Sequence, residues 1–308
     1  MSGLELVPFD EEHFDAAAGL LAEAHEAHRA AEPLLAPADA RAELERALRR
    51  DAVVGLIALR GGEPAGYLVG RVAESPLWDR HVFVDRAGHA AVDPETLRRL
   101  WAAAAETWWE AGARRFFANV PSTPERLDPW YRLSFAQMHQ DAICASGGEA
   151  ALPAGVTIRR GDLEDIETAI EINRLIADTQ LAAPSFSGIE PSDERDDWVE
   201  TLEDPEVAWF VAERDGEPLG HATLYEPAPD LGTPVDAVFL ASTATVPEVR
   251  GLGVGLALTQ HALARARESG HGTIVTNWRV TNLLASHFWP ARGFRPTYVR
   301  LHRAPGVA

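Results

Sequence analysis

The chain is organised around the stretch Ala244-Thr245-Val246-Pro247-Glu248-Val249-Arg250-Gly251-Leu252-Gly253-Val254-Gly255. An apolar, β-branched run ends at Val246, three glycines then alternate with apolar residues, and the segment 256–268 has a helical pattern. A strand that enters a helix through such a turn directs free backbone N–H groups, and the positive end of the helix dipole, towards one point. Glycine also lets a ligand approach the backbone without meeting a Cβ atom. The stretch therefore predicts a site for a phosphate or pyrophosphate group.

The bulk composition limits the class of protein. The chain has 308 residues, a length typical of two domains, with 46% apolar and 24% charged residues, as in folded globular proteins. It has no run of about 18 apolar residues, which argues against a membrane span. The first residues lack the basic and apolar regions of a signal peptide, so a cytoplasmic location is expected. A single cysteine, Cys144, excludes an internal disulfide and a multi-cysteine metal site.

The net charge of −19 bears on the kind of partner. An acidic field of this size disfavours nucleic acid and anionic lipid, and it would attract a cationic small molecule such as an amine. An acidic surface that serves only solubility is the simpler explanation of the same charge. We therefore expect no nucleic-acid partner and no membrane partner.

Strand and helix patterns alternate along both halves of the chain. The predicted strands of the second half are 156–160, 207–213, 218–225, 236–246, 273–277 and 294–302, and its predicted helices are 162–180, 192–202, 256–268 and 281–292. The first half has the same order of patterns between residues 4 and 143. This alternation predicts an α/β or α+β layered fold in which helices cover both faces of a sheet.

Two sequence matches indicate a duplication. The segment Gly62-Glu63-Pro64-Ala65-Gly66 recurs as Gly216-Glu217-Pro218-Leu219-Gly220, an offset of 216 − 62 = 154 residues. Trp130 with Ser134-Phe135 recurs as Trp289 with Gly293-Phe294, an offset of 289 − 130 = 159 residues. Similar offsets at opposite ends of the unit favour a duplicated domain over chance turns. The small, flexible segment 146–155 is interpreted as a linker, so the predicted domains are 1–145 and 156–308.

The second half resembles the GCN5-related N-acetyltransferase (GNAT) family. The family's cofactor motif stands here as Arg250, Gly253 and Gly255, after the pair Val246-Pro247. The family's second motif stands here as Asn282, Ala285, Trp289, Gly293 and Phe294. The resemblance implies two tandem GNAT-like domains, each with a mixed, largely antiparallel central sheet that is flanked by helices and contains a splayed pair of strands.

The resemblance also implies that acetyl-CoA is the co-substrate, that no metal is needed, and that the acetyl group passes directly to a primary amine. The residues that would contact acetyl-CoA are Ala244, Thr245, Val246, Arg250, Gly251, Leu252, Gly253, Val254, Gly255, Asn282, Ala285 and Trp289. The turn would hold the pyrophosphate, and the strand edge 244–246 would pair with the pantetheine arm. Simpler roles stay open: a surface ion pair for Arg250, a helix N-cap for Asn282 and core packing for Trp289.

The candidate catalytic groups are Val246, His221 and Tyr225. The Val246 N–H would polarise the thioester carbonyl. His221 and Tyr225 share one face of the predicted strand 218–225 and are candidates for the general base, with core packing as the alternative role of each. Many family members place a Tyr where Trp289 stands and assign it as the acid for the leaving thiolate. An indole N–H does not transfer its proton at neutral pH.

The first half departs from the family pattern at the corresponding turn, 84–92, which has one glycine. Its helix begins with Asp93-Pro94, and Pro94 has no N–H while Asp93 would place a carboxylate beside a phosphate. We therefore expect a degenerate copy that does not bind acetyl-CoA in the usual way. His25 and His28, one helical turn apart, lack a third metal ligand and are interpreted as part of a solvated helix face.

The first functional hypothesis is an acetyl-CoA-dependent N-acetyltransferase that acts on a small-molecule amine through one site in the second half, as a monomer or homodimer. The segment Leu181 to Pro191 would border its acceptor pocket. One alternative is a non-catalytic acyl-CoA-binding or regulatory protein, since Trp289 replaces the usual Tyr. Another is a mycothiol-synthase-like tandem acetyltransferase, and a third keeps the first half as an effector-binding module.

Overall fold

The structure is a computed structural model that describes residues 3–49, 52–148, 151–188 and 194–306. The start of the predicted helix at Ser192 and part of the predicted linker therefore lie outside the described residues. The chain forms two compact units, the first made of 1–141, 230–232 and 296–308 and the second of 142–229 and 233–295. None of the described helices is both long enough and apolar enough to cross a membrane.

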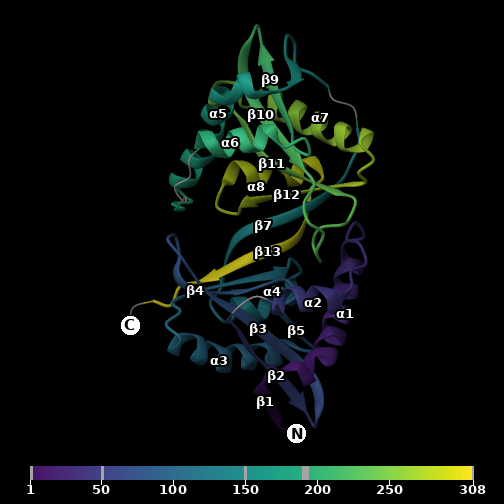
Figure 1. Cartoon of the computed structure of the whole chain (residues 1–308), viewed down its shortest axis with the longest axis vertical. Coiled ribbons are helices and arrows are strands. Elements are labelled where there is room, and N and C mark those ends of the chain that lie inside the picture. The colour runs from purple at the N-terminus through teal and green to yellow at the C-terminus, as the bar shows by residue number, and fades with distance from the viewer. Residues whose placement is uncertain (1–2, 50–51, 149–150, 189–193, 307–308) are drawn as a thin grey trace. The chain divides into compact units, whose positions relative to one another are not determined.

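The first unit is a mixed sheet with helices on both faces (Figure 1). Its strand order is β1 (Leu4–Pro8), β2 (Val53–Arg60), β3 (Glu63–Ser75), β4 (Asp79–Val84), β6 (Arg115–Pro121) and β13 (Arg295–Arg303), and β5 (His89–Ala91) pairs with β3. The β4–β6 pair is parallel and the other pairs are antiparallel. The helices are α1 (Phe14–Ala31), α2 (Ala40–Leu48), α3 (Pro94–Glu110) and α4 (Pro124–Tyr131), with a 3₁₀ turn at Glu11–His13.

Alternation along the strands separates two cores in this unit. Leu68 packs in the core beneath α3 and α4, whereas its neighbours Tyr67 and Val69 pack in the core beneath α1 and α2. Trp101 and Trp108, seven residues apart on α3, are both buried in the first of these cores. Asp93 caps α3 by accepting from the Thr96 N–H, as the Asp-Pro start predicts.

The second unit repeats this architecture (Figure 1). Its strand order is β8 (Thr157–Arg160), β9 (Ala208–Arg214), β10 (Glu217–Tyr225), β11 (Ala237–Thr245) and β12 (Thr273–Arg279), followed by β7 (Ala136–Ala145), whose last four residues belong to this unit. Its helices are α5 (Ile166–Leu181), α6 (Glu194–Glu203), α7 (Val254–Glu268) and α8 (Leu283–Phe288), with 3₁₀ turns at Leu163–Asp165, Pro247–Val249 and Pro290–Arg292. Phe210 faces the core beneath α7 and Val211 faces the core beneath α5 and α6.

The central strands of the second unit diverge. β11 pairs with β12 in parallel only from Ala237↔Thr273 to Phe239↔Val275. The Thr276 hydroxyl still donates to the Leu240 carbonyl at 2.7 Å, and residues 241–245 have no backbone partner on β12. On its other side β11 remains paired with β10 up to Thr245. The expected splayed strand pair is therefore confirmed, and it opens towards the glycine-rich turn.

The matching hairpins confirm the duplication. In the β2–β3 hairpin Ala65 lies in a bulge, and in the β9–β10 hairpin Leu219 lies in a bulge at the equivalent position. The freed Ala65 carbonyl accepts from the Val92 N–H at 3.0 Å, and the Leu219 carbonyl accepts from the Val246 N–H at 2.9 Å. Both pairs are related by the 154-residue offset, so the two copies align without insertion or deletion between this bulge and these valines.

The last strand of the chain pairs with a strand that its own sequence does not predict. The predicted strand 294–302 is present as β13, but it pairs antiparallel with β6, from Tyr298↔Pro121 to Arg303↔Phe116. Residues 296–308 thus belong to the first unit, although they follow the second copy in the sequence. The alternation of residues along a strand indicates which face is buried, but it does not indicate which strand lies next to it.

Candidate active site

The turn between β11 and α7 has the conformation that its glycines predict. Gly251 and Gly253 have φ angles of 80° and 90°, in the left-handed region where other residues lose about 1–2 kcal/mol. Gly253 is the N-cap of α7, and no side chain accepts from the first N–H groups of this helix. Arg250 and Leu252 are exposed on the same turn, and no described carboxylate pairs with Arg250. The turn thus presents uncapped donors and an unpaired cation, which together suit an anion.

Asn282 and Ala285 lie on the other side of the divergent strands, at the start of α8. The Asn282 Oδ1 atom accepts from the Ala285 N–H at 3.2 Å, so the N-cap alternative is the role that the structure shows. The side-chain NH₂ of Asn282 is not part of this cap and is the group that can donate to a ligand. Ala285 packs against the core, and a Cβ at Gly255 would be 3.4 Å from Phe288 Cε2. The glycine therefore also allows α7 to approach α8.

Trp289 is a packed core residue. Only 6% of it is exposed, and its ring meets Phe288 and Phe294 edge-on at centroid distances of 5.0 and 5.1 Å. The core-packing alternative thus describes its position.

The Val246 N–H does not occupy the position that the resemblance implies. Its donation to the Leu219 carbonyl leaves it no proton for a thioester oxygen, so this catalytic assignment is wrong. A bulge in β11 offers other backbone groups: His221 pairs with Ala244 and Thr223 with Ala241, which leaves Ser242 and Thr243 without β10 partners. These two residues also lie beyond the reach of β12. No residue pattern in the sequence identifies this bulge.

His221 is not suited to act as a base. It is completely buried, and its ring lies 5.6 Å from Trp198 and 6.0 Å from Trp209 between ring centroids. Burial lowers its pKa to about 3, because no described group bonds to either ring nitrogen and stabilises the charged form. This burial argues against a catalytic role for His221, which packs in the core beneath α6.

Tyr225 lies at the level where the strands separate. It pairs with Phe239, the last β11 residue that also pairs with β12, and the two rings are 5.3 Å apart. The side chain is 37% exposed, and partial burial raises the pKa of its hydroxyl. The phenol is thus protonated at neutral pH, which suits a proton donor rather than a base.

The segment between α5 and α6 contacts the turn that precedes Asn282. The Thr281 hydroxyl donates to the Ser185 hydroxyl at 2.9 Å, and the neighbouring Phe186 is 75% exposed. The sequence predicted that this segment borders the site but did not single out either residue. Its last residues, 189–191, lie outside the described part of the chain.

His25 and His28 are buried, so their interpretation as a solvated helix face is wrong. His25 Nε2 lies 3.0 Å from the Ala36 carbonyl oxygen, and burial lowers the pKa of His28 to about 4. Among the described residues, no group of three or more His, Cys, Asp and Glu side chains is placed to hold a metal ion.

Comparison with known proteins connects this geometry to a family. Residues 173–294 match the model of the acetyltransferase (GNAT) family. The chain is 29% identical to an N-alpha-acetyltransferase of Sulfurisphaera tokodaii over 151 residues, 47% of this chain and 83% of that protein. It is 32% identical to a mycothiol acetyltransferase of Cellulomonas flavigena over 169 residues, 52% of this chain and 47% of that protein, so it spans about half of that relative.

The fold similarity extends over both halves. A solved tandem GNAT protein from the clavulanic acid biosynthesis pathway aligns with 99% of this chain and 100% of its own, with a TM-score of 0.54 and 17% identity. The family model lies within the second half, where the splayed strands and the glycine-rich turn meet. Residues 173–294 therefore form a domain of the acetyltransferase (GNAT) family, within a chain whose fold is that of a tandem GNAT protein.

Proposed function

We propose that the protein transfers an acetyl group from acetyl-CoA directly to the primary amine of a small molecule, at one site in the second half. The observation that carries this proposal is the divergence of β11 and β12 beside the uncapped start of α7. An open strand edge that leads into an anion site fits a ligand with an amide-containing arm and a pyrophosphate.

The binding roles follow from position. The N–H groups of Gly251 and of residues 253–255, with the Arg250 guanidinium, would neutralise the pyrophosphate, whereas the Leu252 N–H already donates to the Val249 carbonyl at 3.1 Å. The edge of β11 that β12 leaves open, residues 241–245, would pair with the amides of the pantetheine arm. The backbone of Ser242 and Thr243 would replace Val246 as the group near the thioester carbonyl, since both residues lack strand partners on β10. Asn282 would contribute its side-chain NH₂ across the slot.

The first half supports a single acetyl-CoA site. There, α3 begins at Pro94, two residues after Val92, whereas α7 begins at Val254, eight residues after Val246. The Asp93 carboxylate already accepts from the Thr96 N–H at 2.9 Å and pairs with Arg60 at 2.6 Å. A carboxylate on the first helical donors both occupies them and repels a phosphate.

The reaction needs two proton movements. The amine nitrogen attacks the thioester carbon, the C–S bond breaks, the nitrogen loses a proton and the CoA thiolate gains one. We assign Tyr225 as the group that protonates the thiolate, because its phenol is neutral and lies at the strand divergence. The proton lost by the amine would pass to water, since His221 is buried and its pKa of about 3 makes it a weak base.

A non-catalytic acyl-CoA-binding protein is the second candidate function. The observations that favour it are the burial of His221 and the packing of Trp289, which leave two expected positions without proton-transfer chemistry.

Release of CoA thiol in the presence of an amine panel separates these two functions. The panel contains small primary amines, a peptide with a free N-terminus and the acceptor amine of mycothiol acetyltransferases. The last two are chosen because the two relatives are named as an N-alpha-acetyltransferase and a mycothiol acetyltransferase. Amine-dependent release above the hydrolysis rate supports the transferase. Acetyl-CoA binding by calorimetry without turnover of any amine supports the binding protein.

A charge substitution locates the cofactor site. Arg250→Gln should weaken acetyl-CoA binding about three- to tenfold, with a reduced dependence on salt, as expected for loss of one phosphate contact. The matched control is Arg265→Gln near the other end of α7, where Arg265 is exposed and pairs with Glu268. Equal affinities for both variants would contradict placement of the pyrophosphate at this turn.

A further inference from the structure

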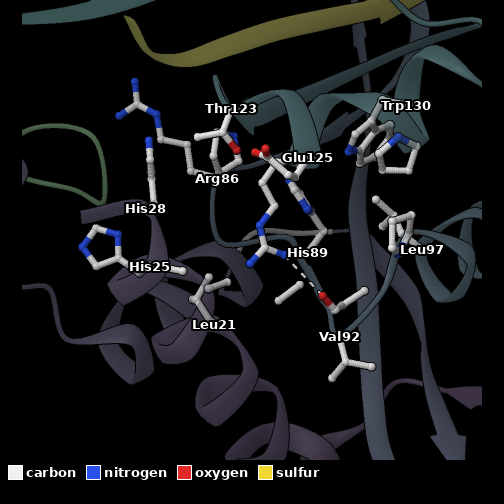
Figure 2. A pocket seen from close by; sticks show the side chains of 18 of the residues that line it. Leu21, His25, His28, Arg86, His89, Val92, Leu97, Thr123, Glu125 and Trp130 are labelled. Atoms are coloured by element: carbon white, nitrogen blue, oxygen red, sulfur yellow. Dashed lines mark hydrogen bonds between the residues drawn. The ribbon is translucent and has the colours of Figure 1, made fainter. Parts of the chain in front are cut away.

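The first unit contains a cavity of about 410 Å³, within the range of small-molecule sites. Residues of α1, of the segment 89–97 and of α4 line it, with Tyr298 of β13. Figure 2 shows His25 and His28 from α1 on one side and Val92, Leu97 and Trp130 on the other. Since Val92 is the counterpart of Val246, this cavity lies beside the degenerate turn, where the usual anion site of the fold is lost.

The walls of the cavity are mainly apolar. Leu21, Leu97, Pro129 and Trp130 contribute aliphatic and aromatic surface, and all four are buried in the fold. The histidines add neutral rings at neutral pH, because burial lowers the pKa of both His28 and His89 to about 4. The cavity therefore suits a ligand with an apolar body.

Two of the four charged side chains that line the cavity are already paired. Arg86 is held by Asp141 at 2.7 Å and by Asp230, and Asp93 is held by Arg60. Glu125 is exposed in the first turn of α4, where the helix dipole stabilises a carboxylate. These three groups have their charge compensated without a ligand.

Arg126 is the remaining charge. Its side chain is half-buried and donates to the Ala91 carbonyl at 3.3 Å, and no described carboxylate forms an ion pair with it. Its positive charge contributes to lowering the pKa of His28 and His89, which places it near both rings. It also lies in the first turn of α4, where the positive end of the helix dipole disfavours a cation.

We propose that this cavity binds a small carboxylate with an apolar body, whose negative group meets the Arg126 guanidinium. The anion would compensate the guanidinium, and the apolar body would lie between Leu21, Leu97 and Trp130. The first half is then a ligand-binding domain that kept the fold and replaced acetyl-CoA with a smaller anion. This inference does not depend on the transferase activity proposed for the second half.

The test compares three ligands of one shape and different charge. The full chain is titrated with 3-phenylpropionate, 3-phenylpropanamide and 3-phenylpropylamine, and binding is measured by ligand-detected NMR. We expect the carboxylate to bind at least tenfold more tightly than the amide, and the amine to bind most weakly. Equal binding of carboxylate and amide, strongest binding of the amine, or binding of none would overturn the proposal. Displacement of 3-phenylpropionate by acetyl-CoA in the Gly253→Ala variant would also overturn it.

Matched variants assign the charge. Arg126→Gln should remove the preference for the carboxylate over the amide, while Arg126→Lys should keep part of it. Arg99→Gln changes an exposed arginine on α3 in the same unit and should leave the preference intact. All three variants should keep the thermal unfolding midpoint of the wild type within a few degrees, because Arg126 and Arg99 lie outside the core. A preference that persists in Arg126→Gln would overturn the role of Arg126.

Discussion

The backbone N–H of Val246 donates to the carbonyl oxygen of Leu219 at 2.9 Å. The first copy has the same bond between Val92 and Ala65, so the two valines are equivalent positions in one repeated frame. Beyond them the copies differ by 8 − 2 = 6 residues before the next α-helix begins. The additional residues of the second copy form the 3₁₀ turn Pro247–Val249 and the glycine-rich turn that follows it. A local difference in chain length after two equivalent strands therefore distinguishes the half that has a glycine-rich turn from the half that lacks one.

Gly253→Ala should weaken acetyl-CoA binding at least tenfold with a moderate loss of stability. The φ of 90° costs a residue with a Cβ about 1–2 kcal/mol, and relaxation of the turn would redirect the first N–H groups of α7. Gly270→Ala is the matched control, because Gly270 has a φ of 91° with open space around it at the other end of α7. Calorimetric titration with acetyl-CoA checks both variants. A similar loss of affinity in both would show that strain alone, not the site, is responsible.

His221→Leu should keep kcat within about threefold of the wild type. The imidazole is fully buried with unbonded nitrogens, so an apolar side chain of similar size removes a desolvation cost without removing a catalytic group. A fall in kcat of a hundredfold at unchanged stability would contradict this and restore His221 as a base.

The same variant should change the pH dependence of stability. In the folded protein the pKa of His221 is about 3, below its usual value of about 6.5 when unfolded, so protonation favours the unfolded chain. Its contribution is complete above pH 6.5 and is lost as the pH falls towards 3, by at most about 1.4 kcal/mol per pH unit. When the free energy of unfolding is measured with urea between pH 7 and 4, it should change less steeply with pH in His221→Leu than in the wild type. Equal slopes would indicate that the imidazole is solvated in the native protein.

Local chemistry predicted much of this molecule. The helices, the hairpins and the duplication follow from spacing, capping residues and glycines, and Gly251 and Gly253 indeed have positive φ. Contacts between segments that are distant in the sequence could not be predicted from such local patterns. The β11 bulge, the pairing of β13 with β6 and the covering of His221 by Trp198 depend on which strands and helices meet. Burial decided the role of His221, and a single-sequence pattern does not report burial on both faces of a sheet.

Tyr225→Phe should lower kcat ten- to hundredfold with little change in the KM for acetyl-CoA. The phenol is the proton donor that we place at the strand divergence, and removal of a general acid costs about this much. Because burial raises the pKa of Tyr225, kcat in the wild type should not decline through deprotonation of this group until the pH exceeds 10. Tyr131→Phe, at a residue of similar exposure (41%) on α4, is the control. Unchanged kcat in Tyr225→Phe would assign the proton transfer to water.

Trp289→Phe should lower the stability by about 1–3 kcal/mol, less than the cost of truncation to Ala, and leave kcat near that of the wild type. The indole is packed between Phe288 and Phe294 and does not transfer a proton, so its loss leaves a cavity rather than a chemical gap. Trp108→Phe, at a fully buried indole of the first unit, should be destabilised to a similar degree and is the control.

Trp289→Tyr separates the two possible roles of this position. If residue 289 only packs in the core, the kcat of Trp289→Tyr should be no higher than that of Trp289→Phe. A tenfold gain of Tyr over Phe would place the leaving sulfur beside residue 289 and transfer the acid role from Tyr225 to that position.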